Sequence, residues 1–545
     1  MAKEKIIKDA IHGYITIDEM FNKIIDTAEF QRLKWIEQGS FRILYPAARH
    51  DRFIHSLGTF YLADKFYESF MENIKEDLKL QCNNEDRLKN TFLYAALLHD
   101  IGHAPFSHTC EGYFQERLDE NQNKKIAVDL INAVSKISGI SDKAADRFKR
   151  EFHSEEPAEH EIVSATILVN NAEKFLGSDI SKVDLELAAR MVIGCPYVYE
   201  EEDETEIEEE GIKNCLIRLV NSTTIDVDKL DYITRDTRMS GFYNASIDIN
   251  RLIKSVTAVK TEGGIYPAYR KNALSVIDNV FRAKTEQGAW MVSHPIVIYD
   301  SALLKACINY YNNRVEGYIN NIFSIEALSC QGVQFNGKSY MLLSDMDIIH
   351  DIKQNYNECD MVKEYFERSR RRHPVWKSYY EFKHIFNPNG ECVIKIDEII
   401  KFFKPLIDIM QIEKVFALDE SNYEKLMENN RKVSEAVKLL KEFSESEGIE
   451  FSFVLLKSTN YFAPKFDPKK VYIAFSEYYG DITYETYENL KNDISHESIK
   501  EETFFYLYSK ERLNKEQLSR FIGVLKDKIE KQHNLLSNKY IYHRE

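Results

Sequence analysis

The stretch Phe92–His108, FLYAALLHDIGHAPFSH, decides how the rest of this sequence is interpreted. Its apolar first half predicts a buried helix, and this run ends abruptly at His99 and Asp100. Two more imidazoles, His103 and His108, follow shortly after. Imidazole nitrogens and carboxylate oxygens are the ligands that a hard or borderline divalent cation prefers. The stretch therefore predicts a rigid helix that ends at a metal site.

Further residues of the same kind lie on either side of this stretch. Seven of the 15 histidines fall between His50 and His160. His55 lies at the start of a second helical pattern, RFIHSLGTFYLA. A fourth ligand is expected in Ile225–Asp236, IDVDKLDYITRD, because alternating acids and apolar residues place several carboxylates on one helical face. The alternative is a set of buried polar residues that satisfy one another without a metal.

Length, composition and charge limit the class of protein. The chain has 545 residues, which predicts two or three domains. Hydrophobic residues make up 44% and charged residues 29%, as in ordinary globular proteins. The formal net charge of -16 argues against binding to nucleic acid or to an anionic membrane through the whole surface. A pocket for an anionic ligand must therefore concentrate positive charge locally.

The cysteines and the N-terminal residues predict a soluble cytoplasmic protein. None of the eight cysteines forms a CxxC pair, which is typical of free thiols in a reducing compartment. The N-terminus, MAKEKIIKDAIHGY, lacks the apolar core of a signal peptide. No apolar run approaches the roughly 20 residues that a membrane-spanning helix needs.

Residues 1–386 are expected to form a mainly helical domain. Glycine and proline are sparse, at 20 and 11, and apolar residues recur at helical spacing. This spacing is present in Phe21–Trp35, Leu57–Phe70, Thr91–Leu98 and His160–Val169. The acidic run 199–211, YEEEDETEIEEEG, is expected to be a solvated surface loop, since nothing in it imposes a metal-ligand geometry.

Residues 387–545 have a different character. Short β-like runs, Glu391–Ile396, Ile449–Leu456 and Val471–Phe475, are interspersed with helical stretches. We expect an α+β region that regulates activity, mediates oligomerisation or binds a protein partner.

The pattern His55, His99-Asp100 and Asp228 resembles the H…HD…D signature of the HD-domain phosphohydrolases. The surrounding segments are more specific: FQRLKWIEQ, HDRFIHSLGTFYLA, LLHDIGHAPFSHTCEG and IDVDKLDYITRD. Together they resemble the deoxynucleoside triphosphate triphosphohydrolases, over roughly Lys5 to Phe386. This resemblance implies a helical HD core in which His55, His99, Asp100 and Asp228 bind one divalent metal, which would be Fe, Mn, Mg or Zn.

The resemblance also implies a catalytic relay of His108, Glu111 and His160, with His103 close to the α-phosphate. His108 and Glu111 are three residues apart, so they would touch on a helix. The carboxylate could then hold the imidazole in one tautomer. The family more often has Asp where this chain has Glu111.

Substrate-binding positions follow from the same resemblance. Arg52 and Lys229 match positions that bind the triphosphate, and Tyr232 and Asp236 match positions that contact phosphate and the sugar 3′-hydroxyl. Gln38 matches another contact beside the 3′-hydroxyl, although ordinary packing or capping roles are the alternative for Gln38, Tyr232 and Asp236. The implied reaction is metal-dependent hydrolysis of a dNTP to deoxynucleoside and tripolyphosphate, with His108 as the proton donor.

A second nucleotide site is implied near the N-terminus. Lys5, Asp26, Gln31 and Lys34 match positions that bind an activating nucleotide in regulated members of the family. Lys34 stands where the animal enzymes read guanine with arginine, and an ammonium does not reproduce the bidentate guanidinium fork. A different base, no activator, or a plain amphipathic surface helix are the alternatives. Nucleotide binding there would favour a homo-oligomer, either a dimer or a tetramer.

The resemblance weakens after residue 280. Phe281–Leu304 departs from the family pattern, so the base preference is not readable, and His294 is either a base-side contact or a helix-end residue. The basic cluster Arg368–Arg372 is either a phosphate or nucleic-acid site or, more typically, a solvated surface or an interface with acidic partners.

The leading hypothesis is therefore a dNTP triphosphohydrolase that balances nucleotide pools or depletes dNTPs during phage infection. One rival is an HD phosphodiesterase or phosphatase that acts on another nucleotide. A second rival is a nucleotide-sensing regulatory subunit whose HD core chiefly binds. The matches at the ligand, relay and phosphate positions argue against both rivals.

Overall fold

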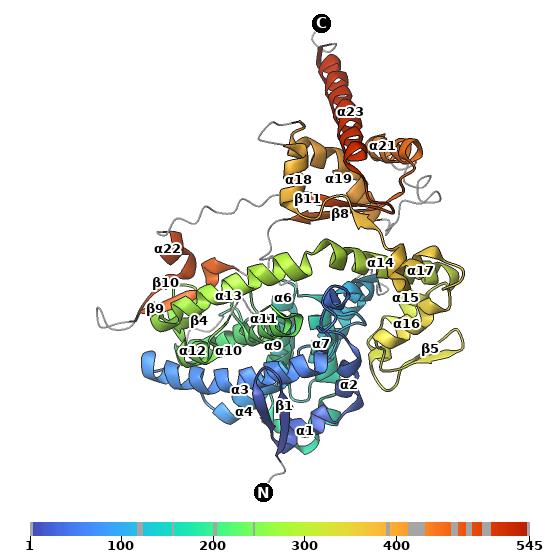
Figure 1. The fold of residues 1–545 in the computed structure, drawn as a ribbon. Coiled ribbons are helices and arrows are strands. Elements are labelled where there is room, and N and C mark those ends of the chain that lie inside the picture. The colour runs from blue at the N-terminus through green and yellow to red at the C-terminus, as the bar shows by residue number, and fades with distance from the viewer. Residues whose placement is uncertain are drawn as a thin grey trace. The chain divides into compact units, whose positions relative to one another are not determined.

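The structure is a computed structural model that describes residues 4–116, 124–154, 157–199, 204–242, 246–387, 393–412, 431–458, 467–475, 482–492 and 503–541. The chain forms two compact units, and each unit is made of separated segments (Figure 1). Unit 1 consists of Met1–Gly288, Val315–His350 and Phe462–Ser498. Unit 2 consists of Ala289–Arg314, Asp351–Tyr461 and Ile499–Glu545.

The two units do not follow the predicted boundary after residue 386. Strand β9 (Tyr472–Phe475) pairs in parallel with β4 (Gly264–Arg270), and this pairing brings a late segment into unit 1. In unit 2, α14 (Pro295–Arg314) packs on α17 (Asp360–Phe366). Each unit therefore contains segments from both sides of residue 386, because long-range contacts bring them together.

Unit 1 is mainly helical, as the sequence predicts. Its larger helices are α3 (Arg52–Asp77), α4 (Glu85–Leu98), α5 (Lys125–Ser135), α6 (Asp142–Phe152), α7 (Glu159–Asn170), α9 (Leu185–Ile193), α10 (Glu204–Val220), α11 (Val227–Ser240) and α13 (Leu274–Gln287). Helix α4 is the predicted apolar helix, and every residue from Thr91 to Leu98 is buried. A helix that is apolar all round must lie inside the protein, so the residues that follow it begin in the core.

One predicted helix, Phe21–Trp35, is broken in the structure. Its residues form α1 (Glu19–Ile25), α2 (Ala28–Gln31) and a 3₁₀ turn, η1 (Arg32–Trp35). The break lies at Thr27, whose hydroxyl donates to Ile24 O at 2.6 Å and accepts from Phe30 N at 3.4 Å. A threonine side chain that caps a new helix competes with continuation of the old one.

Small sheets complete unit 1. The hairpin β1 (Lys5–Asp9) and β2 (Gly13–Ile17) is antiparallel, with Ile7 opposite Ile15. A four-stranded sheet has the order β10-β9-β4-β3, with β3 at Val256–Thr261 and β10 at Thr483–Thr486. A second hairpin joins β5 (Val333–Phe335) and β6 (Lys338–Tyr340). The remaining helices are α8 (Ala172–Leu176), α12 (Ile249–Ser255), α15 (Tyr318–Ile322) and α22 (Tyr487–Asn492), and α16 (Asp345–Lys353) starts in this unit.

Unit 2 contains most of the predicted C-terminal α+β elements, whereas β9, β10 and α22 belong to unit 1. Its sheet has the order β7-β11-β8, from His373–Pro374, Thr503–Ser509 and Phe451–Ser458. Its other helices are α18 (Tyr379–Phe386), α19 (Ile396–Ile412), α21 (Arg431–Glu447) and α23 (Lys515–Ile541). The runs predicted as strands at 449–456 and 471–475 correspond to β8 and β9. In the run 391–396, residues 391 and 392 lie outside the described residues, 393–395 form no strand, and Ile396 begins α19.

The acidic run 199–211 is not a loop over its second part. Residues 204–211 form the first turns of α10, while 200–203 lie outside the described residues. Glu208 pairs with Lys260 at 2.6 Å, Glu209 with Lys213 at 2.9 Å and Glu210 with Arg147 at 2.6 Å. Basic partners offset the repulsion between the carboxylates, and the helix can therefore extend into the acidic run.

Within the described part of the chain, no single helix has the length and apolar composition to cross a membrane. One bent pair of helices, Lys271–Val292 with Pro295–Arg314, reaches that threshold by length and composition.

Candidate active site

The predicted metal ligands come from three helices of unit 1. His55 lies in the first turn of α3, where the side chain of Asp51 caps the helix by accepting from Ile54 N at 3.0 Å. His99 and Asp100 directly follow the last residue of α4. Asp228 lies in the first turn of α11. Rigid helix ends therefore carry all four side chains.

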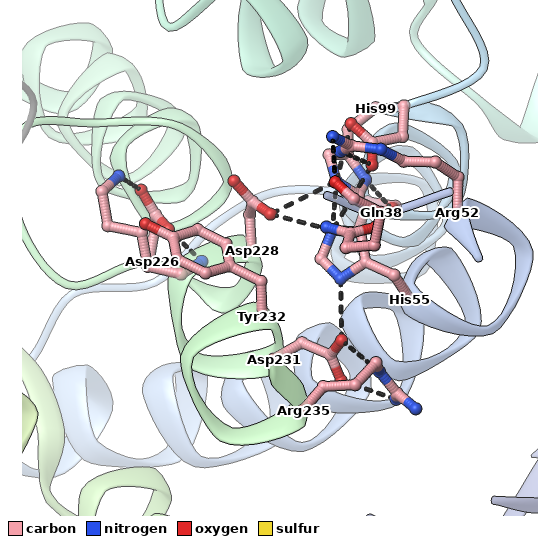
Figure 2. Close-up of polar contacts among 12 residues, drawn as sticks. Gln38, Arg52, His55, His99, Asp226, Asp228, Asp231, Tyr232 and Arg235 are labelled. Atoms are coloured by element: carbon pink, nitrogen blue, oxygen red, sulfur yellow. Dashed lines mark hydrogen bonds and ion pairs between the residues drawn. The ribbon is translucent and has the colours of Figure 1, made fainter. Parts of the chain in front are cut away.

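The four side chains converge on one point, and Figure 2 shows the contacts of Asp228 with His55 and His99. His55 Nε2 lies 3.0 Å from Asp228 Oδ1 and 3.4 Å from Asp100 Oδ2. His99 Nε2 lies 3.2 Å from His55 Nε2, 3.4 Å from Asp100 Oδ1 and 3.5 Å from Asp228 Oδ1. The structure thus brings together the four residues that the sequence marks as metal ligands.

This set of donors fits a divalent cation. The ligand atoms of His55, His99 and Asp100 all lie within 4.8 Å of one another. Burial lowers the pKa of His55, but the carboxylates of Asp228, Asp231 and Asp100 outweigh burial and raise that pKa to about 10. A site that stabilises positive charge so strongly, and offers imidazole nitrogen with carboxylate oxygen, suits Fe, Mn, Mg or Zn.

Hydrogen bonds on the far side of each ring set the orientation of both imidazoles. His55 Nδ1 lies 2.7 Å from Asp231 Oδ2, and His99 Nδ1 lies 2.8 Å from Ala96 O. With a cation bound, Nδ1–H donation to these oxygens would leave Nε2 of each neutral ring as the metal ligand. Asp231 is not among the residues that the sequence singled out. The sequence feature that could have identified Asp231 is its three-residue spacing from Asp228, which places both carboxylates on one face of α11.

A second cluster contains the three residues of the predicted relay together with His103. Glu111 Oε2 accepts from His160 Nδ1 at 2.8 Å and from His108 Nδ1 at 3.1 Å. The rings of His103 and His160 are stacked, with centroids 4.0 Å apart and planes 15° apart. His103 Nε2 lies 3.1 Å from Asp100 Oδ1, so His103 connects the relay to one of the predicted metal ligands. These four ligands, His55, His99, Asp100 and Asp228, are called the metal-type cluster below. The contact between His108 and Glu111 joins two short 3₁₀ turns, Ser107–Thr109 and Glu111–Glu116, and does not run along one α-helix.

The relay has a defined charge pattern. Burial raises the pKa of Glu111, but its hydrogen bonds to His108 and His160 outweigh burial and hold that pKa far below its ordinary value. Burial lowers the pKa of His160, yet Glu111 reverses the effect and raises it. Burial, Arg52 and His160 together hold the pKa of His103 well below its ordinary value. His103 is therefore neutral at pH 7, while the Glu111 carboxylate favours protonation of His160.

Asp345 holds the loop that leads to His108. Phe106 and Ser107 have φ angles of 57° and 51°, a region that residues other than glycine seldom adopt. Phe106 N donates to Asp345 Oδ1 at 2.6 Å, and Glu37 N donates to Asp345 Oδ2 at 3.0 Å. Burial is the main reason that the pKa of Asp345 is raised to about 7. This buried carboxyl group is a support of the site that the sequence did not reveal.

Arg52 and Gln38 lie beside the metal-type residues. The buried Arg52 guanidinium donates to Asp100 Oδ2 at 2.6 Å, to Ser107 Oγ at 3.0 Å and to Gln38 O at 3.1 Å. Gln38 Oε1 is buried and has no hydrogen-bond partner among the described residues. The amide oxygen of Gln38 is therefore available to a donor from a ligand.

Lys229 and Tyr232 line the opposite side of the site, on α11. Lys229 Nζ donates to Ser222 O at 2.8 Å and pairs with the carboxylate of Asp226. Tyr232 Oη accepts from Lys284 Nζ at 2.7 Å. Burial lowers the pKa of Lys284 to about 8. Lys284 is thus a third basic group of the site, and it lies in the segment that could not be matched by sequence.

Asp236, the fifth predicted substrate contact, is buried and held from two sides. His50 Nε2 lies 2.6 Å from Asp236 Oδ1, and Gln287 Nε2 donates to Asp236 Oδ2 at 2.6 Å. His50 is one of the clustered histidines of the sequence, but its neighbours gave no indication of this partner. Gln287 comes from α13, which only the tertiary structure brings to α11.

The predicted effector residues form two surface pairs. Lys5 Nζ lies 3.0 Å from Asp26 Oδ1, and both side chains are about half exposed, at 42% and 56%. Lys34 Nζ donates to Gln31 Oε1 at 2.6 Å and lies 4.5 Å from the ring centre of Phe53. The two pairs carry nucleotide-compatible groups, but their role stays a prediction.

Two other residue groups singled out by sequence lie in unit 2. His294 Nδ1 accepts from Ile296 N at 3.2 Å, which is a local contact at the start of α14. In the basic cluster, Arg370 pairs with Glu367 at 2.6 Å and Arg372 with Glu450 at 2.9 Å. Arg371 pairs with Asp300. These carboxylates neutralise much of the cluster, which favours a surface or interface role over anion binding.

Comparison with known proteins agrees with this geometry. Residues 52–210 match the HD domain family. The chain is 33% identical to the deoxynucleoside triphosphate triphosphohydrolase SAMHD1 of Gallus gallus over 46% of this chain and 36% of that protein. It is 27% identical to an uncharacterised protein of Methanocaldococcus jannaschii over 56% of this chain and 49% of that protein. It is 22% identical to the uncharacterised protein YwfO of Bacillus subtilis over 72% of this chain and 74% of that protein.

The chain thus spans about half or less of the length of the first two of these relatives. Three of the four convergent side chains, His55, His99 and Asp100, lie inside the matched range, while Asp228 lies just beyond it. Residues 52–210 are therefore similar to the HD domain family, and the chain is similar over part of its length to the deoxynucleoside triphosphate triphosphohydrolases.

Proposed function

We propose that this chain hydrolyses a deoxynucleoside triphosphate to a deoxynucleoside and tripolyphosphate. The observation that carries the proposal is that a metal-type cluster and a histidine relay share one wall of the site, joined by the 3.1 Å contact between His103 Nε2 and Asp100 Oδ1. The similarity to relatives with this activity in their name supports the same substrate class.

The reaction needs a nucleophile at the α-phosphorus atom and a proton on the leaving oxygen. A divalent cation held by His55, His99, Asp100 and Asp228 would supply Lewis acidity at the α-phosphate. Water attacks phosphorus and releases a proton to solvent, the bond from phosphorus to O5′ breaks, and His108 donates a proton to O5′. The side chain of His108 is 65% exposed, so its free ring edge can reach a bound substrate.

Glu111 and His160 support His108 in this step. The Glu111 carboxylate accepts from Nδ1 of His108 and therefore directs Nε2 toward the substrate. His160 shares the same carboxylate oxygen and has a raised pKa, so the pair can return a proton to His108 after each turnover. His103 stays neutral and holds its position between the relay and Asp100.

Basic groups on both sides of the site suit a triphosphate. Arg52 and Lys229 are already paired with Asp100 and Asp226, so their charge is positioned before substrate arrives. Lys284 adds an ammonium next to Tyr232. Preorganised cations of this kind stabilise the charge that develops during phosphoryl transfer without reorganisation.

The proposal extends to regulation and to the cellular setting. The exposed pairs Lys5–Asp26 and Gln31–Lys34 would bind an activating nucleotide, and activation would accompany assembly into a homodimer or homotetramer. We place the protein in the cytoplasm, where it would balance dNTP pools or deplete them during phage infection.

The test is a product analysis. The purified chain is incubated with each of the four dNTPs and with GTP, singly and in pairs, in the presence of Mn, Mg or Fe(II), and the products are separated by chromatography. Deoxynucleoside plus tripolyphosphate is the expected result, and the pairs reveal an activator. His108→Ala should lose the activity, whereas the control His153→Ala should keep it, because His153 is an exposed histidine after α6. Mono- or diphosphate products would instead indicate an HD phosphodiesterase or phosphatase, and binding without turnover would indicate a sensor.

A further inference from the structure

The turn between β1 and β2 belongs to a hairpin at the N-terminus, and it directs the buried side chains of Asp9 and His12 into unit 1. Asp9 Oδ1 accepts from Ile11 N at 2.8 Å and from His12 N at 2.7 Å, which closes the turn. The side chain of His12 is only 4% exposed. The ring of His12 also packs on Tyr61 of α3, with centroids 5.0 Å apart. Neither Asp9 nor His12 has a role in the site described above.

Both residues bind the carboxylate and guanidinium that lie behind His55. His12 Nε2 lies 2.6 Å from Asp231 Oδ1. Asp9 Oδ2 accepts from Arg235 Nη1 at 2.9 Å, and Arg235 donates to both oxygens of Asp231, at 2.8 and 2.9 Å. Figure 2 shows Asp231 and Arg235 side by side on α11, with Asp231 directed at His55. One continuous hydrogen-bonded path therefore leads from the hairpin turn to a metal-type imidazole.

The packing at Gly58 leaves the space that this network needs. Gly58 lies on α3, three residues after His55. A Cβ atom at Gly58 would lie 2.0 Å from Asp231 Oδ1 and 2.4 Å from Arg235 Nη2. Only glycine lets α3 approach the Asp231–Arg235 pair this closely, so the helix that carries His55 is itself shaped around the network.

We propose that Asp9 and His12 are positioning residues of the metal centre, which act by fixing Asp231 and through it the ring of His55. This inference rests on the metal binding that the proposed function requires. Asp231 is fully buried and accepts hydrogen bonds from His12, His55 and Arg235, so loss of one donor leaves a buried lone pair unsatisfied and frees the carboxylate to turn. Partners of metal-binding histidines typically change metal affinity about 10- to 100-fold when they are removed.

Two substitutions of His12 separate hydrogen bonding from packing. His12→Phe keeps an aromatic ring against Tyr61 but removes the donor to Asp231. His12→Gln removes the ring but keeps an N–H donor of similar reach. In the full chain, stripped of metal and titrated with cobalt(II), His12→Phe should weaken cobalt binding about 10- to 100-fold and change the visible absorption spectrum of the bound ion. His12→Gln should bind cobalt more tightly than His12→Phe.

Asp9→Asn and Tyr14→Ala complete the series. Asp9→Asn keeps an acceptor for the two turn amides but places an NH₂ group against Arg235, so cobalt binding should weaken, by less than in His12→Phe. Tyr14→Ala is the matched control, because Tyr14 is 67% exposed on the same hairpin. It should bind cobalt like the parent chain.

Unchanged cobalt affinity and spectrum in both His12→Phe and Asp9→Asn would overturn the proposal, and so would tighter binding by His12→Phe than by His12→Gln. Thermal melts of the metal-free proteins show whether a variant is folded, and Asp9→Asn carries the test if His12→Phe does not fold. Failure of dNTP hydrolysis in a parent chain that binds cobalt would contradict the proposed function alone, since affinity and spectrum are measured without substrate.

Discussion

The metal-type cluster and the histidine relay are adjacent, but they are built differently. His55, His99 and Asp228 lie at the ends of long helices and each is fixed by contacts from several directions. His108 and Glu111 lie on short 3₁₀ turns after a loop with two positive φ angles. The first cluster is built to hold a charge in place, whereas the second leaves one ring edge open to a substrate. Substitutions in the two clusters should therefore separate binding of the metal from turnover.

The largest effect is expected in the metal-type cluster. His99→Ala or Asp100→Ala removes one of four convergent donors, so bound metal and hydrolysis should be lost together. Metal catalysis contributes several kcal/mol to such reactions, which corresponds to a rate loss of about 10³-fold or more. Elemental analysis and product chromatography measure the two losses. Full activity in a variant that binds no metal would refute the assignment of the cluster.

The next largest effect is expected in the relay. His108→Ala should lower kcat by about 10²- to 10⁴-fold, the range typical of general acid catalysis, while metal content and dNTP binding stay close to those of the parent chain. Equilibrium dialysis and elemental analysis of the variant provide the comparison. If His108→Ala also lost its metal, the two clusters would depend on each other for metal binding.

The pH profile sharpens the contrast. Glu111 raises the pKa of His160, so Glu111→Gln should lower that pKa. If turnover needs the protonated pair, activity is lost as pH rises through this pKa, and the loss should occur at lower pH in Glu111→Gln. Stability depends on pH in the same direction. The contribution of His160 to the free energy of unfolding is fully present below its ordinary pKa, and it is lost as pH rises through the raised pKa. A profile of kcat against pH for both proteins is the measurement, and an unshifted alkaline limb would contradict the relay.

Asp345 supports the relay from outside it. Asp345→Ala leaves the N–H groups of Phe106 and Glu37 without their acceptor, and an unsatisfied buried donor costs about 1–3 kcal/mol. We expect a lower midpoint of thermal unfolding and a lower kcat, with metal affinity retained. Asp347→Ala, which removes a carboxylate that caps its own helix turn, is a control from the same segment.

The smallest effect on stability is expected at the exposed pairs. Lys34→Ala breaks the contact with Gln31, and contacts between exposed side chains contribute less than about 1 kcal/mol. The free energy of unfolding should therefore be almost unchanged. Activation by a second nucleotide, measured with pairs of dNTPs, should instead be weakened. An activator response equal to that of the parent chain would place the effector site elsewhere.

The residues that were predictable share a physical feature. Helix α4 was readable because a helix that is buried all round is an unbroken apolar run. The metal ligands and relay residues were predicted through the resemblance to a known family, and parts of the motifs that carry it are local, with His99-Asp100 adjacent and His108 three residues from Glu111. The broken helix at Thr27 was not predicted, since its apolar spacing is the same as that of a continuous helix.

The partners of the site were hidden for a different reason. Asp345 and Gln287 reach the site from segments about 240 and 50 residues away from the groups that they bind, and no local pattern marks such pairs. The assembly of each unit from separated segments was also not predictable, because the parallel pairing of β9 with β4 is a long-range contact.

By itself, the sequence determined the mainly helical core and the charge of the molecule, since these depend on composition and short-range periodicity. The eight residues of the two clusters were named through the resemblance to a known family. Only the tertiary structure decided which side chains stand behind those residues. Asp9 and His12 lie far along the chain from Asp231, yet they reach its carboxylate because Gly58 allows α3 and α11 to pack closely. Hydrogen bonds between distant segments depend on this packing, which local sequence does not encode.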